Sequence, residues 1–410
     1  MRFRTAISAE ETAIRSGNPS LQPPAMVMIG DLPEPGGGAA MVCYHMCEEL
    51  RLLGIEVHFI DTEPHRNKIL PPLASYHMVR RKKFPGVRTL LVQSPRKLAE
   101  SLRLFPMVSR CIGIRSALGC VLIAAEAAKV ATRANAPVIL THHAGVRSVA
   151  GLMVARSMGL RLVVYAHGAE WAQPRLSGLA PITALVAKEA NALIVNSRYT
   201  RDLCQANTGR QDITIGAPGV DHSRFNPGVD SRSGDELVVL FVGRLHPRKG
   251  PMVLADAIPL VKSDRPLRFI FSGPDQGEGA RVRQATQDVR PGLRVEFRGP
   301  VAPEDLPQLY GIADVVVCPS ESETFGLVAA EALACGIPVI ASRVGALPEL
   351  VVDGESGLLF DPGSASDLAE KLSILLSDRQ LRRRLATAAP DHAARCSWKA
   401  LGRIVLDAAV

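Results

Sequence analysis

Two glutamates stand out in "ESETFGLVAAEALACGIPVIAS" (321–342), a stretch made mostly of small and apolar residues. Glu323 precedes a helical pattern, and Glu331 lies inside it. If the stretch between them is helical throughout, a rise of 1.5 Å per residue places the two carboxylates about 12 Å apart. At that distance they cannot share one proton. Each can instead accept hydrogen bonds from a pair of vicinal hydroxyls. We therefore expect the pair to hold the two hydroxyl-bearing ends of one ligand.

The same helix offers positive partial charge at its start. The backbone amides of Phe325, Gly326 and Leu327 precede or begin the helical pattern, so we expect them to face negative charge on the ligand. A purely structural alternative remains open, in which Glu323 caps the helix and Glu331 pairs with a nearby arginine.

Two cations follow the end of a predicted strand in "FVGRLHPRKG" (241–250). The guanidinium of Arg244 can grip phosphate oxygens in a fork, and the ammonium of Lys249 can neutralise a second group. A lone arginine here would usually form a surface ion pair, but the spacing of the two cations favours a clamp for a diphosphate.

A glycine triple, Gly36, Gly37 and Gly38, follows the first predicted strand in "GDLPEPGGGAAM" and leads into a helix. Glycines let the backbone approach a ligand and offer amide hydrogens to an anion, although a simple tight turn fits equally well. The spacing G-x-G-x-x-G is absent after this strand, which argues against a nicotinamide enzyme.

Short apolar runs alternate with helical patterns along the chain. One series of predicted strands comprises 26–30, 56–60, 137–141, 161–166 and 192–196, and a second comprises 236–243, 267–273, 294–299, 314–319 and 337–342. Continuous apolar strands separated by helices are typical of parallel sheets covered on both faces. We therefore predict an α/β protein with two doubly wound, Rossmann-like domains facing a central cleft, with ligands at the carboxyl ends of the strands.

The domain boundaries follow from changes in composition. We predict a loose tail at 1–24, an amino-terminal domain at 25–220 and a linker at 221–235, where glycine, proline and small polar residues lack any period. A carboxyl-terminal domain at 236–388 follows, and the helical stretch 389–410 is expected to cross back to the first domain.

The composition bounds the class of protein. With 410 residues, 47% hydrophobic and 21% charged, the chain can bury two ordinary cores. The amino-terminal stretch lacks the apolar core of a signal peptide, and the most apolar helical candidate is interrupted by Glu126 and Lys129, so we expect a cytoplasmic protein. The eight cysteines are scattered without metal-ligand spacing, which favours buried free thiols and predicts no metal site.

The net charge of +8 is concentrated in residues 65–115, which hold twelve basic residues and one acid, Glu100. Leucines and phenylalanines lie between the basic residues. Such a segment could contact an anionic membrane surface or a phosphate-bearing substrate. An ordinary solvated basic face is the alternative.

The sequence resembles the retaining glycosyltransferases of the GT-B fold, in the family 4 or group 1 type. The resemblance runs from about Ala25 to the end of the chain. It is carried most specifically by Glu323 and Glu331 in their sequence context, and also by "VGRLHPRKG", "PGVDHSRFNP", "NSRYTRD" and "THHAG". It implies two Rossmann-like domains, a nucleoside diphosphate sugar (UDP- or GDP-hexose) as donor, an acceptor of unknown identity, and no nucleic acid partner.

The resemblance also implies roles for single residues. Glu323 would bind hydroxyls of the donor sugar and Glu331 the ribose. Arg244 and Lys249 would bind the diphosphate, together with the amides at Phe325, Gly326, Leu327 and the glycines Gly37 and Gly38. The backbone around Arg298 would meet the base. His167 in "VVYAHGAEW" would lie near the transferred sugar and the acceptor, although a histidine at a strand end is more often structural. We interpret His142, His143, Asn196 and Ser197 as supports for the same cleft.

The implied reaction transfers a hexosyl group to an acceptor hydroxyl with retention of configuration. His167, Glu323, Arg244 and Lys249 would form the catalytic set, and no metal or other cofactor is needed because no D-x-D sequence is present to hold one. One departure from the family is "FSGPDQGEG", which lacks the commoner G-x-G. A nucleotide-sugar epimerase of the same fold and a nucleotide-sugar-binding or membrane-surface subunit without catalysis remain as alternatives. For the cytoplasmic protein, peripheral contact with the inner face of a membrane also stays open.

Overall fold

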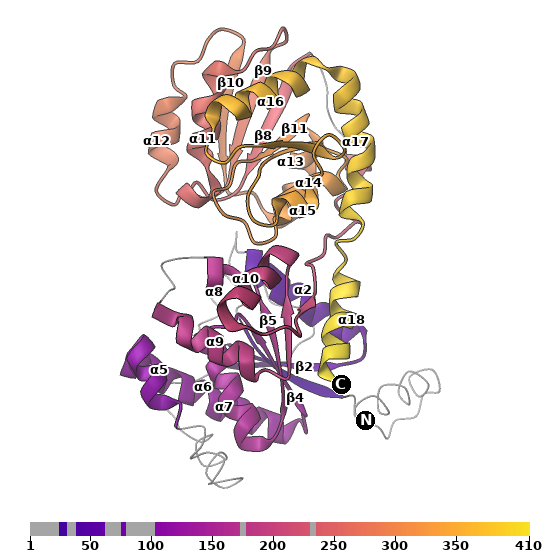
Figure 1. Cartoon of the computed structure of the whole chain (residues 1–410). Coiled ribbons are helices and arrows are strands. Elements are labelled where there is room, and N and C mark those ends of the chain that lie inside the picture. The colour runs from indigo at the N-terminus through magenta and orange to yellow at the C-terminus, as the bar shows by residue number, and fades with distance from the viewer. Residues whose placement is uncertain (1–23, 31–37, 62–74, 79–102, 173–177, 230–234) are drawn as a thin grey trace, which may run out of the picture. The chain divides into compact units, whose positions relative to one another are not determined.

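The computed structural model describes residues 24–30, 38–61, 75–78, 103–172, 178–229 and 235–410 (Figure 1). The chain forms two compact units. Unit 1 comprises Met1–Ala217 and Trp398–Val410, and unit 2 comprises Pro218–Ser397. The predicted tail, the residues Gly36 and Gly37, and most of the basic segment 65–115 lie outside the described residues.

Unit 1 is built on a parallel sheet of seven strands in the order β3-β2-β1-β4-β5-β6-β7. The inner strands are apolar and buried, as expected for strands covered on both faces. All five predicted strands are present. The strands are β1 (Ala25–Ile29), β2 (Glu56–Asp61), β3 (Ser75–Met78), β4 (Val138–His142), β5 (Arg161–Ala166), β6 (Ala192–Val195) and β7 (Thr214–Ile215).

The two strands that the sequence did not predict, β3 and β7, lie at the two edges of this sheet. β3 reads "SYHM" and β7 has two residues, so neither carries a run of apolar residues. An edge strand has only one neighbouring strand and is less buried, so it need not contain the run of apolar residues by which a central strand is predicted.

Helices cover both faces of the unit 1 sheet. The long helix α6 packs against α5 and α7, and α18 packs against α2. The helices are α2 (Gly38–Leu52), α5 (Phe105–Ile112), α6 (Ile114–Arg133), α7 (Val146–Met158), α8 (Ala169–Ala172), α9 (Ala180–Glu189), α10 (Arg198–Thr208) and α18 (Trp398–Ala409).

Unit 2 repeats the plan with six parallel strands in the order β10-β9-β8-β11-β12-β13. The chain order of the strands reverses between β9-β8 and β11, which is the switch point where open α/β sheets bind ligands. All five predicted strands are again present, and the edge strand β13 was not predicted. The strands are β8 (Leu237–Val242), β9 (Leu267–Ser272), β10 (Leu293–Gly299), β11 (Val315–Cys318), β12 (Val339–Ser342) and β13 (Gly357–Phe360). The predicted fold class of two doubly wound domains is confirmed.

The helices of unit 2 pack on this sheet and on one another, notably α14 on α17 and α11 on α16. They are α11 (Pro251–Ala257), α12 (Gly279–Ala285), α13 (Leu306–Gly311), α14 (Leu327–Ala334), α15 (Leu347–Leu350), α16 (Ala365–Ser377) and α17 (Arg379–Ala393), with short 3-10 turns η2 (Pro227–Val229), η3 (Pro247–Lys249), η4 (Ile258–Leu260) and η5 (Pro303–Asp305).

The unit boundaries differ in detail from those expected. The predicted linker 221–235 falls within unit 2, where Val220 N–H and the His222 ring bond to the carbonyl of Cys396. The return to unit 1 begins at Trp398, whereas the predicted segment began at 389, because α17 still belongs to unit 2.

Two global expectations can be compared with the structure. All eight cysteines are free thiols, and every one except Cys111 is buried, as expected. Among the described helices, none combines the length and apolarity needed to cross a membrane.

Candidate functional site

In unit 2, the structure brings Glu323 and Lys249 together at the ends of β11 and β8. The Lys249 ammonium donates to Glu323 Oε2 at 2.5 Å, and both side chains are largely buried. The two loops also bond through their backbones, because Glu321 N–H donates to the Arg248 carbonyl. The acid and the cation expected to bind one ligand are therefore neighbours.

Glycines allow these loops to approach so closely. Gly250 has φ +64°, and a Cβ on it would lie 1.9 Å from the Pro319 carbonyl oxygen. Gly345 has φ +55°, and a Cβ there would lie 1.9 Å from the Glu323 carbonyl oxygen, which also accepts from Ala346 N–H. Both positions need glycine for its positive φ and its lack of a side chain. The Glu323 loop is thus held from two sides.

The start of α14 follows this loop. Gly326 is its N-cap with φ +105°. Within the described residues, no hydrogen bond uses the backbone amides of Phe325, Gly326 and Leu327. These donors at the positive end of the helix are available to an anion.

Arg244 follows β8, but it does not contact Glu323. Its Nη1 donates to Gln276 Oε1 at 3.2 Å, in the loop after β9. That loop is pressed against the Arg244 loop, because a Cβ on Gly273 would lie 1.9 Å from the Gly243 carbonyl oxygen. The unusual "GPDQGEG" stretch therefore orients Arg244 through Gln276, a partner that the sequence did not indicate.

Arg298 lies near the end of β10 and is exposed. Its Nε pairs with Glu296 Oε1 of the same strand. The next residue, Gly299, accepts from Gly273 N–H and from the Ser272 hydroxyl with its carbonyl oxygen. The backbone at the end of β10, rather than the Arg298 side chain, is thus tied to the loops of the site.

Glu331 lies on α14 and remains partly exposed. Its Oε2 accepts a hydrogen bond of 2.8 Å from the hydroxyl of Tyr310. The structural alternative expected an arginine as the partner of Glu331, but Arg224 acts on Glu331 only through its charge, which lowers the pKa of the carboxyl group. Burial raises the pKa of Glu331 to about 7. The sequence missed Tyr310, which is 21 residues away and has no local motif.

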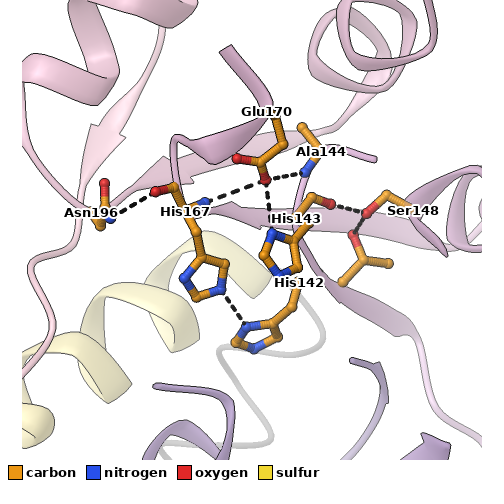
Figure 2. Close-up of polar contacts among 8 residues, drawn as sticks. His142, His143, Ala144, Ser148, His167, Glu170 and Asn196 are labelled. Atoms are coloured by element: carbon orange, nitrogen blue, oxygen red, sulfur yellow. Dashed lines mark hydrogen bonds and ion pairs between the residues drawn. The ribbon is translucent and has the colours of Figure 1, made fainter. Parts of the chain in front are cut away.

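In unit 1, a second polar cluster lies at the ends of β4 and β5 (Figure 2). His142 Nδ1 and His167 Nε2 are 3.1 Å apart, and Asn196 Nδ2 donates to the His167 carbonyl at 2.9 Å. His142 and Asn196 thus both contact His167, while their predicted role as supports of a cleft stays a prediction. Burial lowers the pKa of His167 well below its usual value and that of His142 to about 3, so both rings are neutral at pH 7.

Glu170, which the sequence analysis did not predict, contacts several members of this cluster (Figure 2). Its Oε1 accepts from Ala144 N–H at 2.9 Å and contacts His143 Nδ1 at 3.2 Å. Burial opposes its charge, but the bonds to His143 and to the backbone lower the pKa of Glu170 on balance. Its position three residues after His167 was the available signal.

The strained backbone of His143, at φ +67°, is typical of a functional site. Within the described part of the chain, no three His, Cys, Asp or Glu side chains converge as metal ligands. The cluster is a hydrogen-bonded network in which the rings of His142 and His167 are neutral at pH 7. Of the predicted glycines, Gly38 begins α2, while Gly37 lies outside the described residues.

Two family descriptions match consecutive parts of the chain. "Glycosyltransferase Family 4" matches residues 36–224, and "Glycosyl transferases group 1" matches residues 224–392. The chain belongs to the family 4 and group 1 glycosyltransferases. The resemblance inferred from Glu323, Glu331 and the neighbouring motifs is confirmed.

Curated relatives within this glycosyltransferase family include D-inositol 3-phosphate glycosyltransferases. The protein of Corynebacterium jeikeium is 39% identical over 234 residues, or 52% of this chain and 56% of that protein. The protein of Corynebacterium glutamicum is 40% identical over 52% of this chain and 55% of that protein. The chain thus spans about half the length of the curated relatives it matches.

Solved structures show the same fold along nearly the whole glycosyltransferase chain. Sucrose-phosphate synthase of Thermosynechococcus elongatus superposes with a TM-score of 0.72 at 22% identity, covering 93% of this chain and 97% of that one. HepE of Anabaena, in complex with UDP and glucose, superposes with a TM-score of 0.69 at 21% identity, covering 93% and 98%. These neighbours establish the GT-B fold.

Proposed function

We propose that the protein transfers a hexosyl group from a nucleoside diphosphate sugar to an acceptor hydroxyl, with retention of configuration. The observation that carries the proposal is the Lys249–Glu323 pair, held by two glycine-closed loops at the switch point of unit 2. A carboxylate for sugar hydroxyls and a cation for phosphate lie side by side there, as such a donor requires.

Different groups of the site would bind the diphosphate, the sugar and the ribose of the donor. Lys249, Arg244 and the free amides at the start of α14 would stabilise the charge that grows on the departing diphosphate. Glu323 would orient the sugar and Glu331 the ribose. None of these tasks needs a divalent metal, so we propose a metal-independent reaction.

The HepE structure bound to UDP and glucose supports a uridine nucleotide donor, although GDP-sugars fit the same chemistry. The relatives that act on D-inositol 3-phosphate support a phosphorylated acceptor. We propose that the acceptor is a phosphorylated polyol.

A transfer assay tests this function. The protein is incubated with UDP-glucose, UDP-N-acetylglucosamine or GDP-mannose, and with D-inositol 3-phosphate or unphosphorylated inositol. We expect one donor to be consumed in the presence of the phosphorylated acceptor, and proton NMR of the product to show the anomeric configuration of the donor.

The assay is repeated in EDTA. We expect the rate to stay unchanged, and a loss restored by magnesium or manganese would contradict the metal-independent mechanism. Turnover of donor without any acceptor to an epimerised nucleotide sugar would favour the epimerase instead. Binding of donor with no turnover across the panel would contradict the proposed activity.

We also propose that the basic segment 65–115 of unit 1 binds an anionic membrane surface. Within the described part of this segment, residues 103–115 present exposed Arg103, Arg110 and Arg115. Ile114 and Leu118, on the same helix α6 as Arg115, are 66% and 51% exposed. Cations beside exposed apolar side chains suit the headgroup region of anionic lipids.

Sedimentation with liposomes tests the membrane contact. We expect binding to phosphatidylglycerol vesicles at low salt, with weaker binding at high salt because salt screens the attraction, and no binding to phosphatidylcholine vesicles. A variant with Arg110→Ser and Arg115→Ser should bind less. Equal recovery with both lipids would contradict the proposal and favour a solvated basic face.

A further inference from the structure

Tyr310 on α13 contacts Glu331 on α14 through its hydroxyl group. The side chain of Tyr310 is fully buried, whereas Glu331 remains partly exposed. The hydroxyl donates to Glu331 Oε2 at 2.8 Å. Within the described residues, Oε1 accepts no hydrogen bond, so one carboxylate oxygen is engaged and the other is open.

The tyrosine ring is fixed by its own neighbours. Phe225 meets it edge to face, with ring centroids 5.9 Å apart, and the Arg224 guanidinium lies 5.6 Å from the Phe225 centroid. Arg224 Nη2 in turn donates to the Pro303 carbonyl. Phe225 thus packs on the Tyr310 ring, and Arg224 in turn packs on Phe225. These contacts fix the ring and therefore the position from which its hydroxyl donates.

We propose that Tyr310 is a positioning residue for nucleotide recognition: its hydroxyl holds Oε2 of Glu331, so that Oε1 faces the ribose hydroxyls of the donor. The inference rests on the proposed function, in which Glu331 binds the ribose. A buried phenol donates and does not ionise at neutral pH, so it favours a carboxylate over a carboxylic acid.

Burial and the neighbouring groups together determine the pH above which Glu331 is a carboxylate. Burial raises its pKa to about 7, against the lowering by the Tyr310 hydrogen bond and by Arg224. The thiols of Cys318 and Cys335 stay protonated, because burial raises the pKa of each to about 12. Among the elements packed on α14, β12 carries no titratable side chain, and the other charged groups are Glu349 on α15 and Arg379, Arg382, Arg383, Arg384, Asp391 and His392 on α17.

The sign of the pH effect follows from this arrangement. Above pH about 7, Glu331 is ionised and can accept hydrogen bonds from two ribose hydroxyls. Below that pH it gains a proton and loses acceptor capacity, so ribose recognition weakens. Removing the Tyr310 hydroxyl destabilises the ionised form and should move the transition to higher pH.

The test compares nucleotides with and without ribose hydroxyls. Affinities of UDP and GDP, each alongside its 2′,3′-dideoxy analogue, are measured by calorimetry from pH 5.5 to 9 for the native protein and for Tyr310→Phe. We expect Tyr310→Phe to weaken binding of the preferred ribonucleotide roughly tenfold near pH 7 and less at pH 9, with the dideoxy analogue unchanged. The analogue carries the same diphosphate, so the ratio of the two affinities removes the titration of phosphate.

Tyr165→Phe is the matched control. Tyr165 is as buried as Tyr310, and its hydroxyl donates to the Gly216 carbonyl in unit 1. We expect this variant to bind both nucleotides as the native protein does. Equal weakening of ribonucleotide and dideoxynucleotide by Tyr310→Phe would overturn the inference, since it would indicate a merely structural role.

Glu331→Gln keeps the inference testable if Tyr310→Phe does not fold. In the native protein the ratio of ribonucleotide to dideoxynucleotide affinity should rise with pH through about 7, and in Glu331→Gln it should be flat. A flat ratio in the native protein overturns the positioning role while leaving the proposed function standing. Failure of the native protein to bind either UDP or GDP overturns both.

Discussion

Gly345→Ala is expected to lower the free energy of unfolding by roughly 2 to 3 kcal/mol and to abolish most donor binding. The new methyl group would sit at φ +55° and 1.9 Å from the Glu323 carbonyl oxygen, so the Glu323 loop has to move. The clash is with the Glu323 backbone, which cannot rotate away from the methyl group as the end of a flexible side chain can. The required shift of the loop would move the Glu323 carboxylate away from Lys249. Urea denaturation and nucleotide titration measure the two effects.

Gly354→Ala separates the clash from the backbone strain. Gly354 has φ +77°, but a Cβ there would meet nothing within 4 Å. This variant should lose only about 1 kcal/mol, from the positive φ, and should bind nucleotide normally. If the two variants lose the same stability and the same affinity, the contact between Gly345 and the Glu323 loop does not position the site.

Glu323→Gln is expected to reduce kcat/KM roughly 100-fold while leaving the fold intact. The amide keeps the size of the carboxylate but lacks its charge, so Lys249, 2.5 Å away, loses its counter-ion. The sugar hydroxyls also lose a charged acceptor in the transition state. Steady-state kinetics with the donor that the transfer assay selects, together with the thermal midpoint, provide the measurement.

Glu321→Gln is the matched control, because Glu321 is an exposed acid in the same loop two residues earlier. It removes one negative charge from the loop and should change kcat/KM less than threefold. A similar loss in both variants would mean that the net charge of the loop matters and would argue against a specific role for Glu323.

The sequence predicted the central parts of the fold because these leave a strong local signal. All ten predicted strands are present in the structure, and most of them, including "RLVVYA" and "ELVVLFVG", are buried apolar runs between helices. The edge strands β3 and β7 lacked that signal, whereas the edge strand β13 has an apolar run of only three residues, "LLF". The division between units was also displaced, since 221–235 has the composition of a linker but falls within unit 2, where His222 bonds to the Cys396 carbonyl near the end of that unit.

The sequence predicted Glu323 and Lys249 from two short motifs at strand ends, and the structure brings the two side chains into contact, while their binding of a donor stays a prediction. Pairings across the sheet were not predictable, because they depend on which loops the fold brings together. Gln276 reaches Arg244 from the loop after β9, and Tyr310 reaches Glu331 from another helix. No spacing in the sequence encodes either contact.

The helix α18 belongs to unit 1, although unit 2 lies between it and the rest of that unit in the chain. Trp398, Leu401 and Val405 are buried there, and Arg161 Nε bonds to the Ala408 carbonyl at 2.8 Å. A ribosome therefore synthesises every residue of unit 2 before it adds α18, the last segment of unit 1. Unit 2 can finish folding as one continuous segment, whereas α2 must keep an apolar face uncovered until translation reaches α18.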